Sequence, residues 1–415
     1  MEMVRENTVT DSSRAVLEAL VESVPDHLSE VQKQQFIVRE ILERLNQDTR
    51  DVLRELVDDI ILRMRDYGAS DIEIGGPGTG GTIWLRIQGK KRPFDDLGQF
   101  SLNACNLLIQ CLLSEEQRRV LDRERSLDFS YTVPGGATGQ RYRTSIYYEM
   151  GDLALNMRAI GGSVRNYSDY NFSMSVTRQL SLTYTKQGLV LVTGITGSGK
   201  STTLDAIVDM NNRSVEGHIV VIASPVEYLH ASKKCIVRHR EVGADTRSFK
   251  HGTIEALRQD PDIIVIGEMR DSDTILAGLE AADTGHKVFS TLHTGSATES
   301  VERIIAEVPA AEQDRVRYRL ADVLSCVISQ RLVPGTDGRL VLATEVLVMS
   351  PAIKAAIKNN NIGEIYQMLN EGEKAGMHTM EQDLYRLYRD RKISIETAFN
   401  FANHKRRMHQ MLHAQ

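Results

Sequence analysis

The sequence lacks the features that mark secreted and membrane-spanning proteins. Its four cysteines, at positions 105, 111, 235 and 326, form neither a CxxC pair nor a disulfide-dense pattern. This predicts a reducing compartment and argues against a zinc ribbon. The first twenty residues mix charges, and no later stretch approaches the ~18 uninterrupted apolar residues of a membrane span. We therefore expect a cytoplasmic protein that meets a membrane only through partners.

An excess of basic residues is also missing. The chain has 50 Lys and Arg against 56 Asp and Glu, a formal net charge of -6. Such a balance offers no general attraction to polyanions, which disfavours nucleic acid as a partner. The 415 residues, 41% of them hydrophobic, are enough for at least two independent cores. Two domains with an appendage are expected.

Four segments are predicted from the changing pattern of residues. Apolar residues three and four apart indicate short amphipathic helices in residues 1–50, which we interpret as an appendage. Residues 51–160 mix helical and strand patterns with glycine-rich turns, as in a small α+β domain. Residues 161–175 are rich in Gly, Ser, Asn and Tyr and are predicted to be the linker and a hinge.

The remaining segment, residues 176–415, predicts an α/β domain with a helical end. Four strand-like apolar runs, GLVLVTG, HIVVIAS, DIIVIGE and HKVFSTLH, alternate with helical patterns. This alternation is typical of a parallel sheet with both faces covered. From about residue 345 onward only helices are expected.

A phosphate-binding loop follows the first of these runs. The stretch GITGSGKSTT fits the pattern GxxxxGK[ST] and lies between a predicted buried strand and a predicted helix, the context that makes the motif specific. Glycines let backbone N–H groups converge on phosphate oxygens, the lysine reaches the β and γ phosphates, and the serine can ligate Mg²⁺. We expect ATP and Mg²⁺ to be held by Gly194, Thr196, Gly197, Ser198, Gly199, Lys200, Ser201 and Thr202.

Two further side chains are expected at the same edge of the sheet. Glu268 ends the run DIIVIGE and would act on Mg²⁺ through a bound water, because Gly267 stands where such strands usually carry Asp. His293 ends the next strand and could hydrogen-bond the γ phosphate. A solvent-facing acidic strand end and an ordinary hydrogen-bonded histidine are the alternatives.

Several motifs in order resemble the PilT-type pilus retraction ATPases of the secretion ATPase superfamily. They are the phosphate loop, ALRQDPDIIVIGEMRDSDTILAGLEAADTGHKVFSTLHT, SCVISQRLVP and GMHTMEQDLYRLYRDRKIS. The resemblance covers about residues 52–402. It implies a PAS-like N-terminal domain, a RecA-like ATPase domain and a homohexamer at the inner face of the bacterial inner membrane. An inner-membrane platform protein, and related pilus ATPases, would be its partners.

The resemblance also implies roles for residues that the pattern alone does not single out. Glu227 matches the last carboxylate of the family motif TxEDPxE and would polarise the attacking water, while Ala223 and Ser224 replace the two earlier acidic positions. The resemblance implies that Arg143 and Arg158 reach into the neighbouring subunit's site, where they would meet the charge that develops on the γ phosphate, and Arg258 and Arg270 match further arginines of the family. By themselves they would be taken for salt-bridged or solvated arginines.

The sequence thus predicts a motor that disassembles pilin filaments for retraction and twitching motility. The missing acidic residues leave open a nucleotide-gated subunit of low activity. The family's retraction signature AIRNLIRE is present only as AIKAAIKN, so an extension or secretion-system ATPase is a further alternative. A DNA or protein translocase shares the fold, and a small-molecule kinase is disfavoured because no lid segment is evident.

Overall fold

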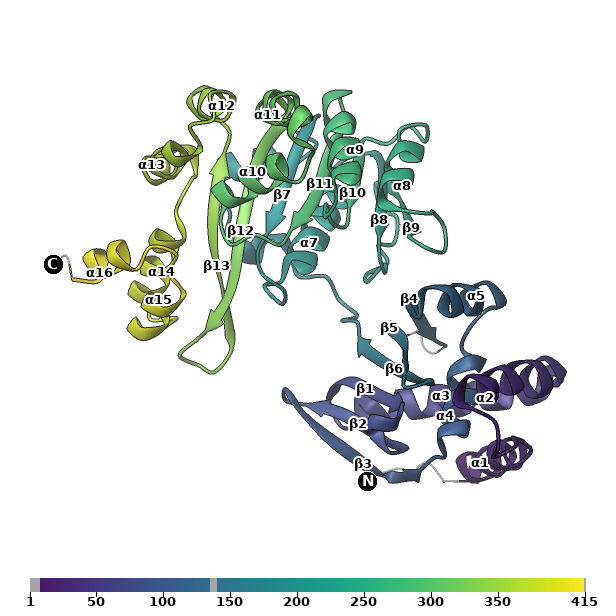
Figure 1. The fold of residues 1–415 in the computed structure, drawn as a ribbon. Helices are drawn as coiled ribbons and strands as arrows, with labels where there is room; N and C mark the ends of the chain where they lie inside the picture. Colours follow the sequence, from purple (N-terminus) through teal and green to yellow (C-terminus); the bar gives the residue numbers. More distant parts are fainter. Residues whose placement is uncertain (1–7, 135–139, 414–415) are drawn as a thin grey trace. The chain divides into compact units, whose positions relative to one another are not determined.

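The protein folds into two compact units. The computed structural model describes residues 8–134 and 140–413, and the chain divides into Met1–Gly162 and Ser163–Gln415 (Figure 1). The glycine-rich turn that we expected between two strands of the first unit lies at residues 135–139, outside the described residues. Each unit has its own hydrophobic core, as the sequence predicts.

Unit 1 is a six-stranded antiparallel sheet with helices packed against it. The strand order is β3-β2-β1-β6-β5-β4. Apolar and polar residues alternate along strands such as β5, so one face of the sheet is buried and the other carries polar side chains. The strands are β1 (Ala69–Gly75), β2 (Thr82–Ile87), β3 (Lys90–Gln99), β4 (Ser126–Val133), β5 (Gln140–Glu149) and β6 (Asp152–Ala159). The helices that follow the N-terminal segment are α3 (Gln47–Asp66), α4 (Leu102–Cys111) and α5 (Glu115–Glu124).

The N-terminal segment is helical, as predicted, but it is built into unit 1. It forms α1 (Thr8–Val21), α2 (Glu30–Phe36) and two short turns, Ile37–Ile41 and Leu42–Arg44. Leu17 and Ile37 are fully buried in the same hydrophobic cluster as the residues of α3 and the sheet. Removing the segment would therefore expose the core that it covers. The segment precedes the predicted α+β domain in sequence, but in the structure it is packed as part of unit 1.

Unit 2 is a seven-stranded sheet in the order β13-β12-β7-β11-β10-β8-β9. All neighbouring strands are parallel except β12 and β13. Every residue of β7, β10 and β11 is buried, which requires cover on both faces and confirms the prediction from their apolar runs. The strands are β7 (Gly188–Thr193), β8 (Gly217–Ala223), β9 (Cys235–Glu241), β10 (Ile263–Ile266), β11 (Lys287–Leu292), β12 (Leu324–Pro334) and β13 (Leu340–Val348).

One group of helices accompanies this sheet and a second group forms the C-terminal part of the described chain (Figure 1). The first group is α6 (Met174–Leu180), α7 (Lys200–Ser214), α8 (Phe249–Ala256), α9 (Ser272–Asp283), α10 (Ala297–Ala306) and α11 (Ala310–Val323). The second is α12 (Pro351–Lys358), α13 (Ile365–Glu371), α14 (Met380–Arg389), α15 (Ile395–Phe401) and α16 (Lys405–His413). Helices α14 to α16 form a small core of their own with the outer part of the β12–β13 pair. The predicted helical end is confirmed.

The segment expected to be the linker is shared unevenly between the units. The division falls after Gly162, within residues 161–175. The later part contains a 3-10 turn, Tyr167–Tyr170, and both Tyr167 and Phe172 pack against the core of unit 2. Tyr167 also shares a 2.9 Å hydrogen bond with Thr177 of α6. These contacts attach most of the segment to unit 2, and the hinge stays a prediction.

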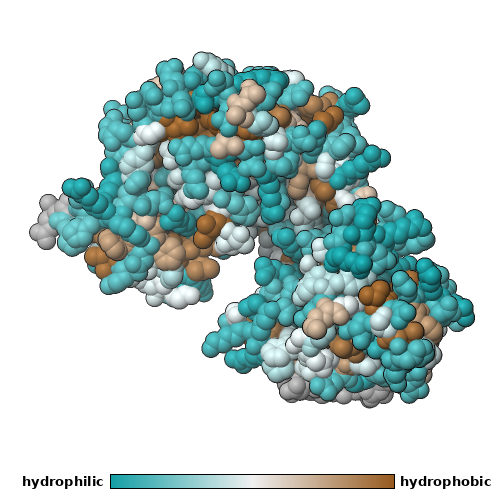
Figure 2. All heavy atoms as spheres, viewed as in Figure 1, coloured by the Kyte–Doolittle hydropathy of each residue, from teal (hydrophilic) through white to brown (hydrophobic). Residues whose placement is uncertain are grey.

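The described helices include none that is long and apolar enough to cross a membrane. The face of the molecule drawn in Figure 2 is mostly hydrophilic, with hydrophobic side chains in separate small groups. Surfaces of this kind are ordinary for folded domains, because apolar atoms always contribute a share of the exposed area.

Candidate functional site

The carboxyl ends of the parallel strands gather the predicted site residues of unit 2 at one edge of the sheet. The phosphate loop follows β7, Glu268 follows β10, His293 follows β11, and the segment with Glu227 follows β8. Because β7, β11, β10 and β8 are neighbours in this order and run parallel, these four segments leave the sheet on the same side. Ligands of open α/β sheets bind at such an edge.

The phosphate loop has a backbone that only glycine readily adopts at its start. Gly194 has a φ of 147°, and a Cβ there would collide with the Gln330 carbonyl oxygen and the Ser198 hydroxyl. The loop leads directly into α7, which begins at Lys200. The exposed Thr196, Gly197, Ser201 and Thr202 therefore surround the positive end of a helix dipole.

The side chain of Lys200 occupies the phosphate loop and is hydrogen-bonded to its backbone. Its Nζ donates to the carbonyl oxygens of Gly194, at 2.9 Å, and Ile195, at 3.1 Å. Burial lowers the pKa of Lys200, and the negative charge of Glu268 opposes this change. The amine thus sits folded back on the loop, beside a carboxylate, where a triphosphate could take over its hydrogen bonds.

The structure adds Gln330, on β12, to the site. This side chain is fully buried and donates from Nε2 to the Ser198 carbonyl oxygen, 2.8 Å away. It fixes the loop from the strand next to β7. The sequence signal was present in the motif SCVISQRLVP, which contributed to the resemblance without a role for any of its residues.

Glu268, Arg270 and His293 form one charged group. Glu268 Oε2 lies 2.8 Å from Arg270 Nε and 3.7 Å from His293 Nε2. Burial lowers the pKa of His293, and the positive charges of Lys200 and Arg270 lower it further. The imidazole is therefore neutral near pH 7 and can exchange a hydrogen bond without carrying charge. The structure brings these three predicted residues together.

The backbone and side chains around Gly267 leave little space for the aspartate usual at this position. A Cβ on Gly267 would lie 3.2 Å from the Ile222 carbonyl oxygen and 3.3 Å from both Ala223 Cα and Phe249 Cε1. These contacts are tighter than ordinary packing. The first carboxylate after β10 is consequently Glu268.

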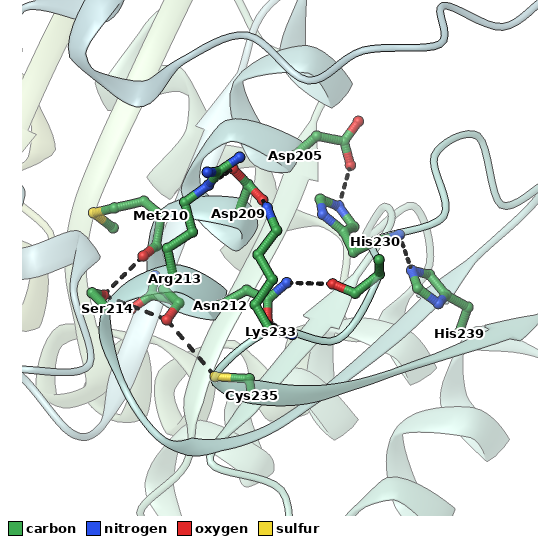
Figure 3. Close-up of polar contacts among 12 residues, drawn as sticks. Asp205, Asp209, Met210, Asn212, Arg213, Ser214, His230, Lys233, Cys235 and His239 are labelled. Carbon is green, nitrogen blue, oxygen red and sulfur yellow. Dashed lines mark hydrogen bonds and ion pairs between the residues drawn. The ribbon is translucent and has the colours of Figure 1, made fainter. Parts of the chain in front are cut away.

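The segment that carries Glu227 is tied to the phosphate-loop helix (Figure 3). Buried Asn212 of α7 accepts from the Lys233 N–H at 3.0 Å and donates to the Ala231 carbonyl at 2.8 Å. His230, also buried, has its Nε2 3.1 Å from Asp205 Oδ1. Glu227 itself is half-buried. Hydrogen bonds from three side chains thus join α7 to the segment that begins at Ser224.

One predicted arginine, Arg258, does not lie at the sheet edge that carries the phosphate loop and Glu268. Arg258 follows α8 and precedes β10, and the carbonyls of Gln259 and Asp260 contact His218 near the start of β8. It is therefore at the amino ends of the parallel strands, whereas Glu268 is at their carboxyl ends. A role for Arg258 in the site would need a neighbouring subunit, and it stays a prediction.

Arg143 and Arg158 belong to unit 1, where they are neighbours. They are directly opposite each other on β5 and β6. Arg158 binds the buried Asp71 through Nε at 2.8 Å and a terminal nitrogen at 2.7 Å. Arg143 is exposed on the polar face of the sheet. Both arginines thus belong to the sheet of unit 1, and their contact with a nucleotide stays a prediction.

The described residues contain no cluster of three or more His, Cys, Asp or Glu side chains that could hold a metal ion unaided. Mg²⁺ in nucleotide sites needs fewer protein ligands, since it keeps several waters and takes most of its other ligands from the phosphates. The exposed Ser201 hydroxyl and the half-buried Glu268 carboxylate fit that requirement.

Comparison with known proteins assigns the chain to a family. The family model described as Type II/IV secretion system protein matches residues 46–398. The chain belongs to this family. A twitching motility protein of Neisseria gonorrhoeae is 37% identical over 318 residues, 76% of this chain and 83% of that protein. The type IV pilus retraction ATPase PilT of Pseudomonas aeruginosa is 37% identical over 331 residues, 80% of this chain and 93% of that protein.

Solved structures agree with the sequence matches. A crystal structure of the pilus retraction motor PilT with bound ADP has a TM-score of 0.76 and 36% identity, covering 85% of this chain and 99% of that one. The ATPase DotB of Legionella pneumophila has a TM-score of 0.72 at 25% identity, covering 83% of this chain and 94% of that one. The resemblance to PilT-type ATPases and the predicted fold class are confirmed.

Proposed function

We propose that this chain is an ATP-hydrolysing motor that powers the retraction of type IV pili. The observation that carries the proposal is the meeting of the phosphate loop, Glu268 and His293 at one sheet edge. The similarity to retraction ATPases over most of the chain supplies the direction of the motor. AIKAAIKN, the counterpart of the retraction signature, folds into α12, which buries Ile353 and Ile357 in the core of unit 2.

Each residue has a defined part in this proposal. Lys200 and the N–H groups before α7 bind the phosphates, and Ser201 with Glu268 would hold Mg²⁺, which neutralises phosphate charge when bound. Glu227 orients the attacking water. His293 and Arg270 contact Glu268 and would register the loss of the γ phosphate. Loss of the γ phosphate would also change the contacts of Lys200 at the start of α7, and α7 is hydrogen-bonded to the segment with Glu227.

The assembly is part of the proposal. A homohexamer would bring Arg143 and Arg158 of one subunit to the nucleotide of the next, and a platform protein at the inner membrane would receive the motion. Arginine suits this task because its guanidinium stays protonated and binds two oxygens at once.

ATP turnover by the purified protein tests the enzymatic part. We expect Lys200→Ala and Glu268→Gln each to reduce turnover by about a hundredfold or more, because the first removes a positive charge that stabilises the transferred phosphoryl group and the second removes a carboxylate that would hold Mg²⁺. Lys234→Ala and Glu302→Gln are matched controls, since both side chains are exposed. Normal turnover after either site substitution would refute the assignment.

Pilus number tests the direction of the motor. In the bacterium that encodes this chain, deletion should leave excess surface filaments, and the wild-type gene should restore the normal number. Glu227→Gln should fail to restore it. Bald cells after deletion would instead identify an extension motor.

A subunit of low activity is the second candidate, because Ala223 and Ser224 stand where the family carries acidic residues. The similarity to the type IV pilus ATPase PilU of Pseudomonas aeruginosa, 34% identical over 293 residues, is compatible with either reading. Retention of ATP without phosphate release, even with partner motors present, would favour this candidate. Robust turnover by the isolated protein would exclude it.

A further inference from the structure

Unit 1 contains a cavity lined by three arginines that the motor mechanism does not use. The cavity has a volume of about 340 Å³ and is lined by Arg50 and Arg54 of α3 and Arg118 of α5. Leu42, from the N-terminal segment, closes one side. The family model begins only at residue 46, so this wall precedes the part of the chain that the family shares.

The three guanidinium groups are anchored by main-chain carbonyls. Arg50 donates from one terminal nitrogen to the carbonyls of Leu42, at 2.8 Å, and Glu43, at 3.3 Å. Arg54 donates to the Cys111 carbonyl at 3.3 Å. Arg118 donates from one terminal nitrogen to the carbonyls of Gln110 and Leu113, at 3.2 and 2.6 Å. Each group is therefore fixed in place by one nitrogen, while its other nitrogens keep donors to offer.

Their charges lack a direct ion pair in the part of the chain that the structure describes. Within residues 8–134 and 140–413, none of the three forms an ion pair with a carboxylate within 4.0 Å. Arg50 Nε is buried without a hydrogen-bond partner among those residues. Burial lowers the pKa of Arg118, the nearby positive charge of Arg50 lowers it further, and the carboxylates of Glu115 and Glu43 oppose the change. Three cations thus converge at an energetic cost that a bound anion would offset.

Two carboxylates also line the cavity, and the partner of each is a residue other than the three arginines. Asp51 Oδ1 accepts from Gln47 Nε2 at 2.8 Å. Glu115 pairs with Arg119, which is on the outer surface of α5. Ser114, the capping residue of α5, lies beside them and its hydroxyl accepts from the Gln117 N–H at 3.2 Å. The start of a ten-residue helix therefore adds partial positive charge next to the arginines.

We propose that this cavity binds a small soluble ligand through a phosphate group, at a site separate from the nucleotide loop. Guanidinium groups match phosphate oxygens in both charge and geometry. The volume is within the range of small-molecule sites, about 300–1,000 Å³. Because the site joins the N-terminal segment to α3 and α5, an occupied site would tie that segment to the rest of unit 1.

Binding of inorganic pyrophosphate to the full-length protein tests this proposal. All variants carry Lys200→Ala, which removes the phosphate loop as a competing site, and binding is followed by calorimetry at constant ionic strength. We expect saturable binding that Arg54→Gln and Arg118→Gln each weaken by roughly tenfold or more, the loss of one charge-assisted contact. Arg54→Lys keeps the charge and should recover part of the affinity.

Arg123→Gln is the matched control, because Arg123 is on the same helix as Arg118, carries the same charge and is exposed outside the cavity. Its affinity should stay within about twofold of the parent, since only distant charge is lost. Circular dichroism shows whether each variant is folded. Arg54 makes only one carbonyl contact, so Arg54→Gln keeps the test decisive if Arg118→Gln unfolds.

Three results would overturn the proposal. One is the absence of saturable pyrophosphate binding by the parent. Another is binding that is equal in the parent and in both glutamine variants. The third result would identify a lipid headgroup as the source of phosphate. If the protein sediments with phosphatidylglycerol vesicles and pyrophosphate does not release it, the arginines bind a membrane surface. Sedimentation that pyrophosphate abolishes, or none at all, agrees with a small soluble ligand.

Discussion

At the scale of single residues, the least expected side chain is Lys287 on β11. It is fully buried, its Nζ has no hydrogen-bond partner among the described residues, and the ring centroid of Phe289 is 5.7 Å away. Burial lowers its pKa from 10.5 to about 8. A buried ammonium without an ion pair destabilises the fold, since the charged form loses its hydration.

We predict that Lys287→Met stabilises unit 2 at pH 7. The lowered pKa corresponds to roughly 3 kcal/mol of destabilisation while the amine is protonated in both states. Between about pH 8 and 10.5 only the unfolded chain binds this proton, so the stability of the wild type should rise with pH. The variant should lack that rise.

Urea denaturation at pH 7 and pH 9.5 measures both effects. Lys234→Met, at an exposed position, removes the same charge without relieving burial and should change stability little. A Lys287→Met protein that is less stable than the wild type at pH 7 would show that the amine has a favourable partner.

Single residues were predicted well where a short motif fixes their geometry. The phosphate loop, Glu268 and His293 are where the spacing predicts, because a strand end and a helix start leave few choices for the backbone. Lys287 and Gln330 were not singled out. Both belong to strands, and burial of one polar side chain depends on neighbouring strands that are distant in sequence.

At the scale of elements, the missed strands are mostly those at the margins of the sheets. β3, β9 and β13 were not predicted, and each is an outermost strand; β6 and β12, which lie inside their sheets, were not predicted either. Strands in this position need fewer apolar residues and can carry charge or proline, as KKRPFDDLGQ does in β3. β7, β10 and β11 of unit 2 were predicted correctly because cover on both faces demands continuous apolar runs.

The hydrogen bonds between α7 and the Glu227 segment lead to a prediction at this scale. Asn212→Ala leaves the Lys233 N–H and the Ala231 carbonyl without their partner, which costs about 1–3 kcal/mol locally. We expect ATP turnover to fall several-fold, because Glu227 would be less well positioned. ATP affinity should change little, since the phosphate loop is at the other end of the helix.

Turnover and ATP affinity, measured separately, test this element. Arg213→Ala is the control on the same helix, because Arg213 is exposed and, among the described residues, forms an ion pair only with Asp209, and Asp209 keeps its ion pair with Lys233 when Arg213 is replaced. An Asn212→Ala enzyme with normal turnover would mean that the segment is held in other ways or that Glu227 has no part in the reaction.

At the scale of the whole molecule, the predicted site is divided between two units, and this division can be tested. The nucleotide loop belongs to unit 2, whereas Arg143 and Arg158 belong to unit 1. Arg158 also holds the buried Asp71, so replacing it would disturb the fold as well as any site. Arg143 is the cleaner target. We predict that Arg143→Gln subunits, like Lys200→Ala subunits, are nearly inactive when pure.

Mixing the two variants should restore activity if the site is shared between subunits of a ring. An Arg143→Gln subunit has an intact phosphate loop, and a Lys200→Ala neighbour has an intact Arg143. Random mixing in equal amounts would then rebuild roughly a quarter of the interfaces, as head-to-tail contacts in a closed ring allow. Arg123→Gln mixed with Lys200→Ala is the control for dilution alone, because Arg123→Gln is expected to be active by itself. Turnover that stays at the level of the pure variants at every ratio, while light scattering shows mixed assemblies, would show that Arg143 does not act at the site of a neighbouring subunit.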